Sequence, residues 1–227
     1  MKDIKLSKRL SAAAELCREG SFIADVGTDH AYLPIYLAGK GKIRGGVVSD
    51  INRGPIERAR AHIAEAELGG VLTPLLCDGL SGLESYLKGD RADIFILGMG
   101  GELIARIISD APFVKKEGVR LILQPMTHPE ILRKFLLDSG FAIVAERLVK
   151  EEKIYQLICA EYSGEKTEYS RTELMFGRSN IEGRNPLLPE LLCHTERVMA
   201  DRIKGKRISG ADTSEEEYIL KEIEKLK

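Results

Sequence analysis

The sequence Phe22-Ile23-Ala24-Asp25-Val26-Gly27-Thr28-Asp29-His30-Ala31-Tyr32-Leu33-Pro34 decides the fold of this chain. It starts as a short apolar run, passes through an acidic residue and a glycine, and ends in a second apolar segment. This order is typical of a strand-to-helix turn in a parallel sheet. Gly27 lets the backbone turn sharply and lets a ligand approach closely, and the helix that follows offers free N–H groups. The stretch therefore predicts a cofactor site whose rim is backbone.

The residues after Gly27 limit the kind of cofactor. A dinucleotide-binding turn follows G-x-G-x-x-G, and its second glycine makes room for a pyrophosphate. Asp29 stands at that second position. A carboxylate there repels a pyrophosphate but attracts a cationic ligand, such as S-adenosylmethionine with its sulfonium and ammonium groups. Alternatively, Asp25 and Asp29 only cap the following helix.

The composition is that of an ordinary globular protein. The 227 residues are 44% hydrophobic and 30% charged, with a net charge of -1, which suits one full-sized core and a small appendage. No apolar run reaches the roughly 18 to 20 residues that cross a bilayer. Residues 1–5 carry charges where a signal peptide needs an apolar core, so we expect a cytoplasmic protein and no membrane contact.

The four cysteines, at positions 17, 77, 159 and 193, are too widely spaced for a zinc knuckle or a C-x-x-C redox pair. We therefore expect reduced, packed thiols and no metal. Because the net charge is close to zero, a nucleic-acid partner would have to bind to local basic patches.

Apolar runs that alternate with amphipathic segments predict an α/β fold with a mostly parallel sheet. A helix over 7–19 leads into the first strand, and Pro125 is expected to break the fifth strand. The last two strands, separated by a short charged turn, predict a hairpin at the sheet edge. The expected strands are 22–26, 45–50, 71–76, 93–97, 120–124, 141–149 and 153–161.

Acidic residues or glycines follow four successive strands of this sheet. Asp50 follows the second strand about 20 residues after the glycine turn, where an acid accepts both hydroxyls of a ribose. After the third strand, Asp78 can accept from the exocyclic amine of adenine while a neighbouring N–H meets a ring nitrogen. The glycines of 98–101 serve either tight turning or the packing of a cofactor and a flat substrate on bare backbone. Since the carboxyl ends of parallel strands share one edge, these turns are expected to converge.

The sequence changes character at Ser163. A polar linker over 163–166 is followed by two apolar stripes, within 187–203 and 218–226, that predict helices packed in an antiparallel hairpin. We therefore expect two domains, 1–163 and 164–227. The basic end of the helical arm either is a solvated surface or contacts phosphate.

Four motifs, at 25–34 (D-V-G-T-D-H-A-Y-L-P), 78–80, 98–101 and 123–125, together resemble the bacterial tRNA (adenine(22)-N1)-methyltransferase family, TrmK-like. The resemblance covers essentially the whole chain. It implies a Rossmann-like class I methyltransferase domain with a small C-terminal α-helical, coiled-coil-like domain. It also implies S-adenosyl-L-methionine as donor and a D-arm adenine of tRNA as acceptor. The acid after the second strand is Glu in some members, and Asp50 keeps its carboxylate chemistry on a shorter side chain.

On this resemblance, the acids and glycines of the motifs would line the donor pocket, together with their neighbours in the turns. The expected donor-binding residues are Asp25, Gly27, Thr28, Asp29, Asp50, Ile51, Asn52, Asp78, Gly79, Gly98 and Met99.

The expected reaction needs alignment more than a strong base, because adenine N1 has an in-plane lone pair and no proton to lose at neutral pH. Residues 98–101 lack the N/D-P-P-Y sequence with which enzymes engage an exocyclic amine, and this fits a ring-nitrogen acceptor. Asp29 is the leading candidate to hold the adenine amino group or to compensate the charge of the product cation. His30 and Tyr32 are candidates for orientation or stacking, although His30 could equally be a hydrogen-bonded turn residue.

The target adenine must be unpaired or flipped out, because N1 faces the partner base in a duplex. Basic residues of the first helix and of the arm are expected to contact the RNA backbone. They are Lys5, Lys8, Arg9, Arg197, Arg202, Lys204, Lys206 and Arg207.

Two other classes of protein stay open at this point. A methyltransferase of another RNA, a protein or a small molecule would keep the donor pocket but show no activity on this site of tRNA. A non-catalytic module would bind the donor or RNA without turnover. The sequence does not specify the oligomeric state or the tRNA species.

Overall fold

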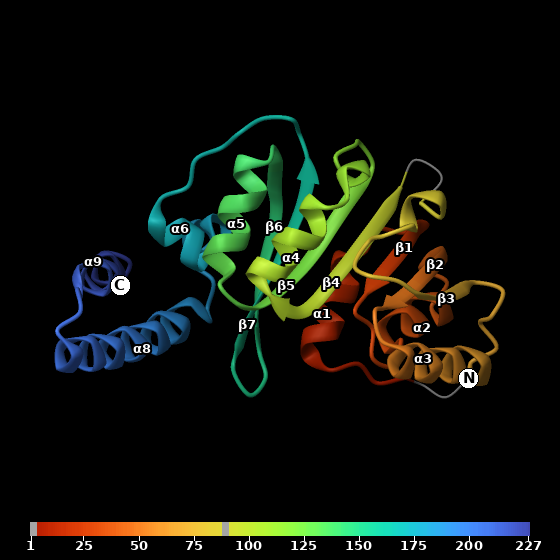
Figure 1. Ribbon diagram of the computed structural model, residues 1–227, viewed down its shortest axis with the longest axis horizontal. Coiled ribbons are helices and arrows are strands. Elements are labelled where there is room, and N and C mark those ends of the chain that lie inside the picture. Colours follow the sequence, from red (N-terminus) through yellow and green to blue (C-terminus); the bar gives the residue numbers. More distant parts are fainter. Residues whose placement is uncertain (1–3, 88–90) are drawn as a thin grey trace.

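The protein is built on a seven-stranded sheet (Figure 1). The structure is a computed structural model, and it describes residues 4–87 and 91–227. Residues 1–3 of the charged N-terminal stretch thus lie outside the described residues. The strands are β1 (Ser21–Val26), β2 (Ile43–Asp50), β3 (Leu72–Leu76), β4 (Ala92–Gly100), β5 (Val119–Thr127), β6 (Phe141–Lys150) and β7 (Ile154–Tyr162).

The strands lie in the order β3-β2-β1-β4-β5-β7-β6. The first five pair in parallel, whereas β7 pairs antiparallel with both β5 and β6. The predicted Rossmann-like sheet with a hairpin at its edge is therefore confirmed. The strand order reverses between β1 and β4, and the carboxyl ends of the parallel strands share one edge.

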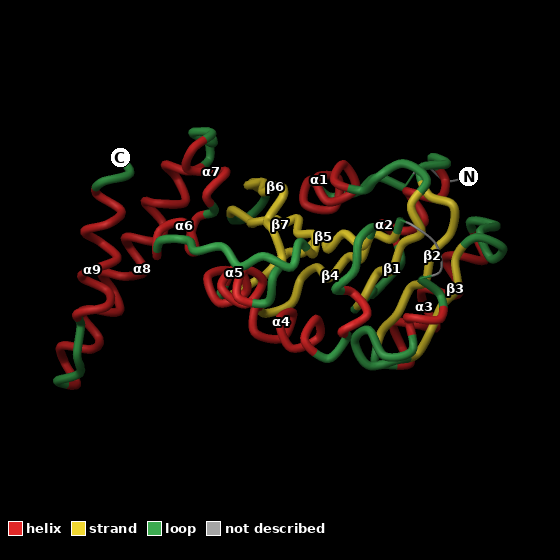
Figure 2. The backbone as a smooth tube through the Cα atoms, turned by 90° about the horizontal axis from the view of Figure 1, so that it is seen from above, coloured by secondary structure: helices red, strands yellow, loops and turns green. Residues whose placement is uncertain are grey.

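Helices cover both faces of the sheet, because apolar side chains alternate along the central strands. Ile94 and Ile96 of β4 belong to the core on one face, and Phe95 belongs to the core on the other. Figure 2 shows α1 on one side of the sheet and α4 and α5 on the opposite side. The first five α-helices are α1 (Lys8–Leu16), α2 (Tyr32–Gly39), α3 (Arg53–Glu65), α4 (Gly101–Ser109) and α5 (Pro129–Asp138), and two short 3₁₀ turns are η1 (Leu83–Ser85) and η2 (Pro112–Val114).

The prediction that Pro125 breaks the fifth strand was wrong. β5 continues to Thr127, and Pro125 pairs with Met99 of β4, which itself runs on to Gly100 through two register shifts. On its other side, β5 pairs with β7 only as far as Leu123. A proline is tolerated where one side of a strand is unpaired, because its missing N–H then leaves no ladder bond unmade.

The C-terminal part is helical, as predicted, and α8 packs against α9. Its apolar side chains form a core that also includes Leu148 of β6. Figures 1 and 2 show α8 and α9 reaching away from the sheet beyond β6. The division at residue 163 stays a prediction, supported by the polar stretch at 163–166. The helices of this arm are α6 (Arg171–Phe176), α7 (Arg178–Glu182), α8 (Leu188–Ser209) and α9 (Ser214–Glu224).

A buried ion pair attaches the arm to the sheet. The side chains of Arg133 on α5 and Glu146 on β6 are both 0% exposed, and Nε of the arginine donates to Oε1 at 2.7 Å. Nη1 of Arg133 also donates to the carbonyl oxygens of Leu174, at 2.8 Å, and Met175, at 3.3 Å. The second carboxylate oxygen accepts from the backbone N–H of Ser179 at 3.1 Å. These bonds offset the cost of burying two charges and fix α6 and α7 in place.

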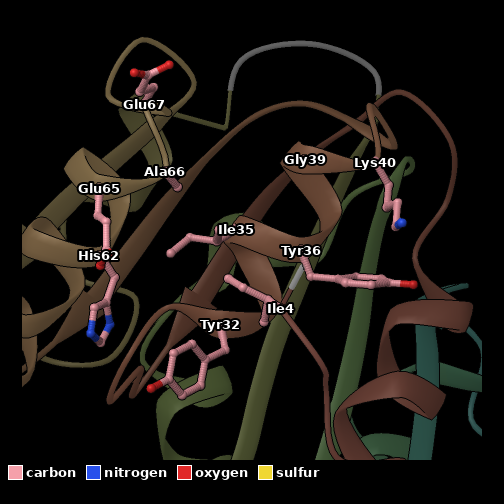
Figure 3. A pocket seen from close by; sticks show the side chains of 10 residues that line it. All are labelled: Ile4, Tyr32, Ile35, Tyr36, Gly39, Lys40, His62, Glu65, Ala66 and Glu67. Atoms are coloured by element: carbon pink, nitrogen blue, oxygen red, sulfur yellow. The ribbon is translucent and has the colours of Figure 1, made fainter. Parts of the chain in front are cut away.

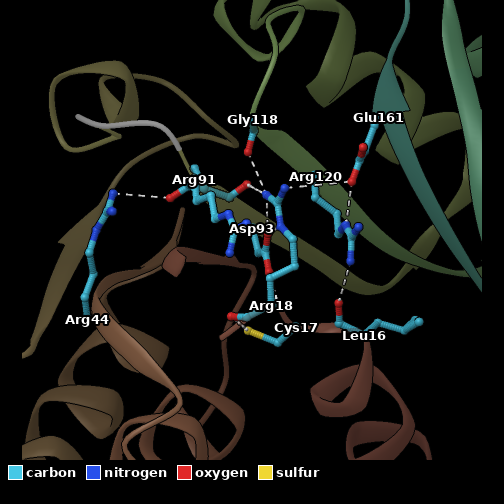
Figure 4. A network of polar contacts seen from close by, with 10 residues as sticks. Leu16, Cys17, Arg18, Arg44, Arg91, Asp93, Gly118, Arg120 and Glu161 are labelled. Atoms are coloured by element: carbon cyan, nitrogen blue, oxygen red, sulfur yellow. Dashed lines mark hydrogen bonds and ion pairs between the residues drawn. The ribbon is translucent and has the colours of Figure 1, made fainter. Parts of the chain in front are cut away.

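A second polar network fixes α1 across the amino ends of the strands (Figure 4). Arg18, just beyond α1, donates from Nε to Oδ1 of Asp93 at 2.8 Å and from its backbone N–H to Oδ2 at 2.7 Å. Its Nη2 also donates to the carbonyl oxygen of Gly118 at 2.6 Å. With its last turn held at the amino edge, α1 extends along the sheet and places its first residues at the carboxyl edge.

Candidate active site

The candidate active site is a cavity of about 270 Å³ at the carboxyl ends of β1 and β4. The strand order reverses at this point, which is where open parallel sheets bind their ligands. The cavity is lined by Arg9, Leu10, Asp25, Gly27, Thr28, Asp29, His30, Ala31, Tyr32, Leu33, Leu97 and Gly98.

The turn after β1 has the sharp, left-handed bend that Gly27 predicts. Gly27 has φ +77°, and a Cβ on it would lie 2.1 Å from Cε of Met99. The hydroxyl of Thr28 accepts from the N–H of Ala31 at 3.0 Å, and Ala31 itself has a left-handed φ of 57°. The side chain that supports the start of α2 is therefore Thr28 and not an aspartate. This weakens the alternative in which Asp25 and Asp29 only cap that helix.

Asp25 is a buried carboxylate in this cavity. Burial raises its pKa to about 6, although a hydrogen bond with Thr28 acts in the opposite direction. Within residues 4–87 and 91–227, no cationic side chain forms an ion pair with it. A ligand that brings a positive charge would stabilise the ionised form. The sulfonium and ammonium groups of S-adenosyl-L-methionine fit this requirement.

Asp29 is exposed at the cavity rim and is held by two side chains. Its Oδ1 accepts from Nη2 of Arg58, on α3, and its Oδ2 lies 3.2 Å from Nε2 of His30. The hydrogen bond from Arg58 holds the pKa of Asp29 below its usual value. The site thus presents an oriented, ionised carboxylate. Sequence reasoning missed Arg58, because nothing local indicates that it reaches the β1–α2 turn.

Three near-parallel rings gather beside Asp29. The centroid of His30 lies 5.0 Å from that of Tyr32, and the ring of His62, on α3, lies 5.4 Å from both. Nδ1 of His62 donates to the carbonyl oxygen of His30 at 3.0 Å, so this ring carries its proton on Nδ1. Tyr32 is 42% exposed and offers a flat surface on which a base can stack. His62 is a second residue that the sequence analysis missed.

A larger cavity of about 630 Å³ continues from these rings between α2 and α3 (Figure 3). Tyr32 and His62 line it, and Tyr32 also lines the candidate active site. The two cavities therefore meet at the ring cluster. In the part of the chain that the structure describes, no three His, Cys, Asp or Glu side chains are grouped as metal ligands. No helix there is long and apolar enough to cross a membrane.

Most of the other predicted donor-binding residues lie at the same sheet edge, on the β2 and β3 side of the cavity, whereas Met99 belongs to β4. Asp50 is paired with Leu76 of β3, and its Oδ1 accepts from the N–H of Asn52 at 2.7 Å. Asp50 and Asp78 both raise the pKa of the Cys77 thiol, after burial as the larger cause, so the two carboxylates share one neighbourhood. The predicted residues outside the cavity lining are Asp50, Ile51, Asn52, Asp78, Gly79 and Met99.

Two glycines of 98–101 lie at positions where a side chain would interfere, Gly98 at the cavity and Gly101 between two turns. Gly98 has φ +79° and lines the cavity, where bare backbone can face a ligand. A Cβ on Gly101 would lie 2.2 Å from the carbonyl oxygen of His128, so this glycine lets the β4–α4 and β5–α5 turns pack together.

The residues predicted to bind RNA separate into two groups. Lys5 and Lys8 are exposed near the start of α1, whereas Arg9 lines the cavity itself. The remaining ones lie on α8, beyond β6 from the cavity (Figure 1). Two of these are paired with α9, Lys206 with a carboxylate oxygen of Glu216 at 2.8 Å and Arg207 with one of Glu217 at 3.0 Å. The α8 residues are Arg197, Arg202, Lys204, Lys206 and Arg207.

The chain is similar in sequence to known methyltransferases. The family described as "Methyltransferase domain" matches residues 6–158. A tRNA (adenine(22)-N(1))-methyltransferase from Bacillus subtilis (strain 168) is 35% identical over 178 residues, which are 78% of this chain and 74% of that protein.

Solved structures of methyltransferases superpose on this chain over nearly its whole length. The B. subtilis m1A22 tRNA methyltransferase TrmK is 29% identical, with a TM-score of 0.79 over 98% of this chain and 95% of that one. A Streptococcus pneumoniae protein described as a candidate tRNA (m1A22) methyltransferase, in complex with S-adenosyl-L-methionine, is 29% identical. Its TM-score is 0.85 over 96% of this chain and 99% of that one. This chain therefore belongs to the tRNA (adenine(22)-N1)-methyltransferase family.

Proposed function

We propose that this protein transfers a methyl group from S-adenosyl-L-methionine to N1 of adenine 22 in the D-arm of tRNA. The observation that carries the proposal is the convergence of Asp25, Asp29 and an exposed ring cluster on one cavity at the switch point of the sheet. Membership of the tRNA (adenine(22)-N1)-methyltransferase family supports methyl transfer as the reaction of this cavity. Since the substrate is tRNA, we place the reaction in the cytoplasm.

The donor would lie along the carboxyl edge of the sheet. When bound, it supplies an electrophilic methyl group on a sulfonium. Asp25 faces its positive charges, and the bare backbone at Gly27 and Gly98 allows close approach. Asp50 holds the ribose hydroxyls, and Asp78 accepts from the adenine amine.

The acceptor adenine would enter at the ring cluster. Tyr32 and His62 offer flat surfaces against which a flipped or unpaired base stacks. Asp29 accepts a hydrogen bond from the adenine amino group. A carboxylate has about four acceptor sites, so Asp29 can accept this bond while Arg58 and His30 hold its side chain in place. The same negative charge compensates the positive charge of the N1-methylated product. The protein therefore aligns the N1 lone pair and needs no base to remove a proton.

The activity test uses wild-type protein, radiolabelled donor and unmodified bacterial tRNA, followed by mapping of the methylated base. We expect label on adenine 22, and none on a matched tRNA in which guanine replaces that adenine. An Asp29→Asn variant should lose about 10²-fold or more in kcat, with a smaller effect on donor affinity, because its carboxylate acts mainly on the acceptor. Equal label on both tRNAs would contradict the assignment of the site, and absence of label from any RNA would contradict the substrate class.

We further propose that the arm contacts the tRNA backbone through cations that are not already paired with α9. Arg197 is exposed, and it forms no ion pair within the described residues. Arg197→Ala should reduce the slope of log affinity against log salt by about one, whereas Lys206→Ala should change it less because Glu216 already pairs with that ammonium. A tRNA affinity that does not depend on salt would exclude a role for the arm's cations.

A further inference from the structure

Arg9 occupies a position that an RNA backbone contact does not explain. It is the second residue of α1, and it lines the candidate active-site cavity together with Asp25, Gly27 and Gly98. A Cβ on Gly98 would lie 3.6 Å from Nη1 of Arg9, so the guanidinium lies directly beside the carboxyl end of β4.

The guanidinium is held in place by neutral groups from two strands. Nη1 donates to Oε1 of Gln124, on β5, at 2.6 Å, and Gln124 is fully buried and donates in turn to the carbonyl oxygen of Pro125 at 2.8 Å. Cζ lies 5.4 Å from the ring centroid of Tyr155, on β7. The backbone N–H of Arg9 donates to a carboxylate oxygen of Glu151 at 2.7 Å, which fixes the start of α1. Contacts within the protein therefore fix the position of the Arg9 side chain without a ligand.

Among the described carboxylates, Glu152 interacts electrostatically with Arg9, but it accepts its hydrogen bond from the Tyr155 hydroxyl. Within residues 4–87 and 91–227, no carboxylate forms an ion pair with the Arg9 guanidinium. The carboxylate of Asp29, which lines the same cavity, is taken by Arg58 and His30. A half-buried guanidinium with free N–H groups gains most from a planar anion that it can bind through two hydrogen bonds.

We infer that Arg9 binds the α-carboxylate of the methyl donor. This inference rests on the proposed function, because it takes S-adenosyl-L-methionine as the occupant of the cavity. The donor has one anionic group, the carboxylate at the end of its methionine part. Arg9 provides the positive side of the cavity and Asp25 the negative side, which matches the opposite charges of the donor's carboxylate and ammonium.

The test is isothermal titration calorimetry of the full chain with two donors. S-adenosyl-L-methionine carries the carboxylate, and decarboxylated S-adenosylmethionine lacks it while keeping the sulfonium and the ammonium. Arg9→Met should weaken binding of the first donor by about 10-fold to 100-fold and change binding of the second by less than about 2-fold. Arg9→Lys should fall between wild type and Arg9→Met, since it keeps the charge without the two-pronged geometry.

Lys8→Met is the matched control, because it removes an exposed charge from the neighbouring position of α1 and should leave both affinities unchanged. Wild-type protein alone gives a second measurement that does not depend on the folding of a variant. It should bind S-adenosyl-L-methionine about 10-fold to 100-fold more tightly than the decarboxylated donor.

Three results would overturn the inference. If Arg9→Met weakens both donors equally, the arginine supports the shape of the cavity and does not bind the carboxylate. If Arg9→Met binds both donors like wild type and loses affinity only for tRNA, its anion is an RNA phosphate. If wild-type protein binds neither donor, the proposed function fails, and the assignment of Arg9 fails with it.

Discussion

Replacing Asp25 with asparagine should make the stability of this protein less dependent on pH between about pH 4 and pH 7. In the folded protein, burial raises the pKa of Asp25 from 3.8 to about 6. Between these two pH values the folded state keeps a proton that the unfolded state has lost. The carboxyl group therefore destabilises the folded protein increasingly as the pH rises, and the full penalty is reached above about pH 6.

The size of this penalty follows from the two pKa values. Their difference, at about 1.36 kcal/mol per pH unit, corresponds to about 3 kcal/mol. Asparagine has nearly the same shape and does not ionise. The free energy of unfolding of Asp25→Asn, relative to wild type, should therefore rise by about 2 to 3 kcal/mol from pH 4 to pH 7.

Urea unfolding of both proteins at half-unit steps of pH measures this difference, and the other titrating groups cancel in the comparison. Asp78→Asn is a suitable control, because it removes an exposed carboxylate from the same sheet edge. Parallel pH profiles for wild type and Asp25→Asn would refute the reasoning. The variant should also bind S-adenosyl-L-methionine less tightly at pH 7.5, because the cavity then lacks its buried negative charge.

Two further predictions concern stability, one from close backbone packing and one from a buried ion pair. Gly101→Ala should lower the free energy of unfolding by about 1 to 3 kcal/mol, because its Cβ would lie 2.2 Å from the carbonyl oxygen of His128; Gly69→Ala, whose Cβ meets nothing within 4 Å, is the control in thermal unfolding. Arg133→Met should cost about 3 to 5 kcal/mol, because it leaves the carboxylate of Glu146 buried without its partner. Adding Glu146→Leu should recover most of this loss in chemical denaturation, and a double variant no more stable than Arg133→Met would contradict a buried-charge penalty.

The sequence determined those features that depend on local chemistry. A glycine with positive φ after β1, acids after β2 and β3, and apolar runs between them are all readable over short stretches. Their convergence could be predicted as well, because the carboxyl ends of parallel strands necessarily share an edge. The error at Pro125 has a tertiary cause, since a proline is tolerated only where the neighbouring strand does not pair, and no local pattern shows where β7 stops.

Only the tertiary structure decided which distant side chains complete the site. Periodicity shows which face of a helix is buried, but it does not show which strand end that face meets. Arg58 and His62 therefore looked like ordinary positions of α3 until the fold placed them against Asp29 and His30. Arg9 looked like a surface cation until Arg18 and Asp93 fixed the other end of α1 and brought it into the cavity. The strand-end chemistry is local, whereas the cations around it come from helices whose positions depend on contacts across the whole chain.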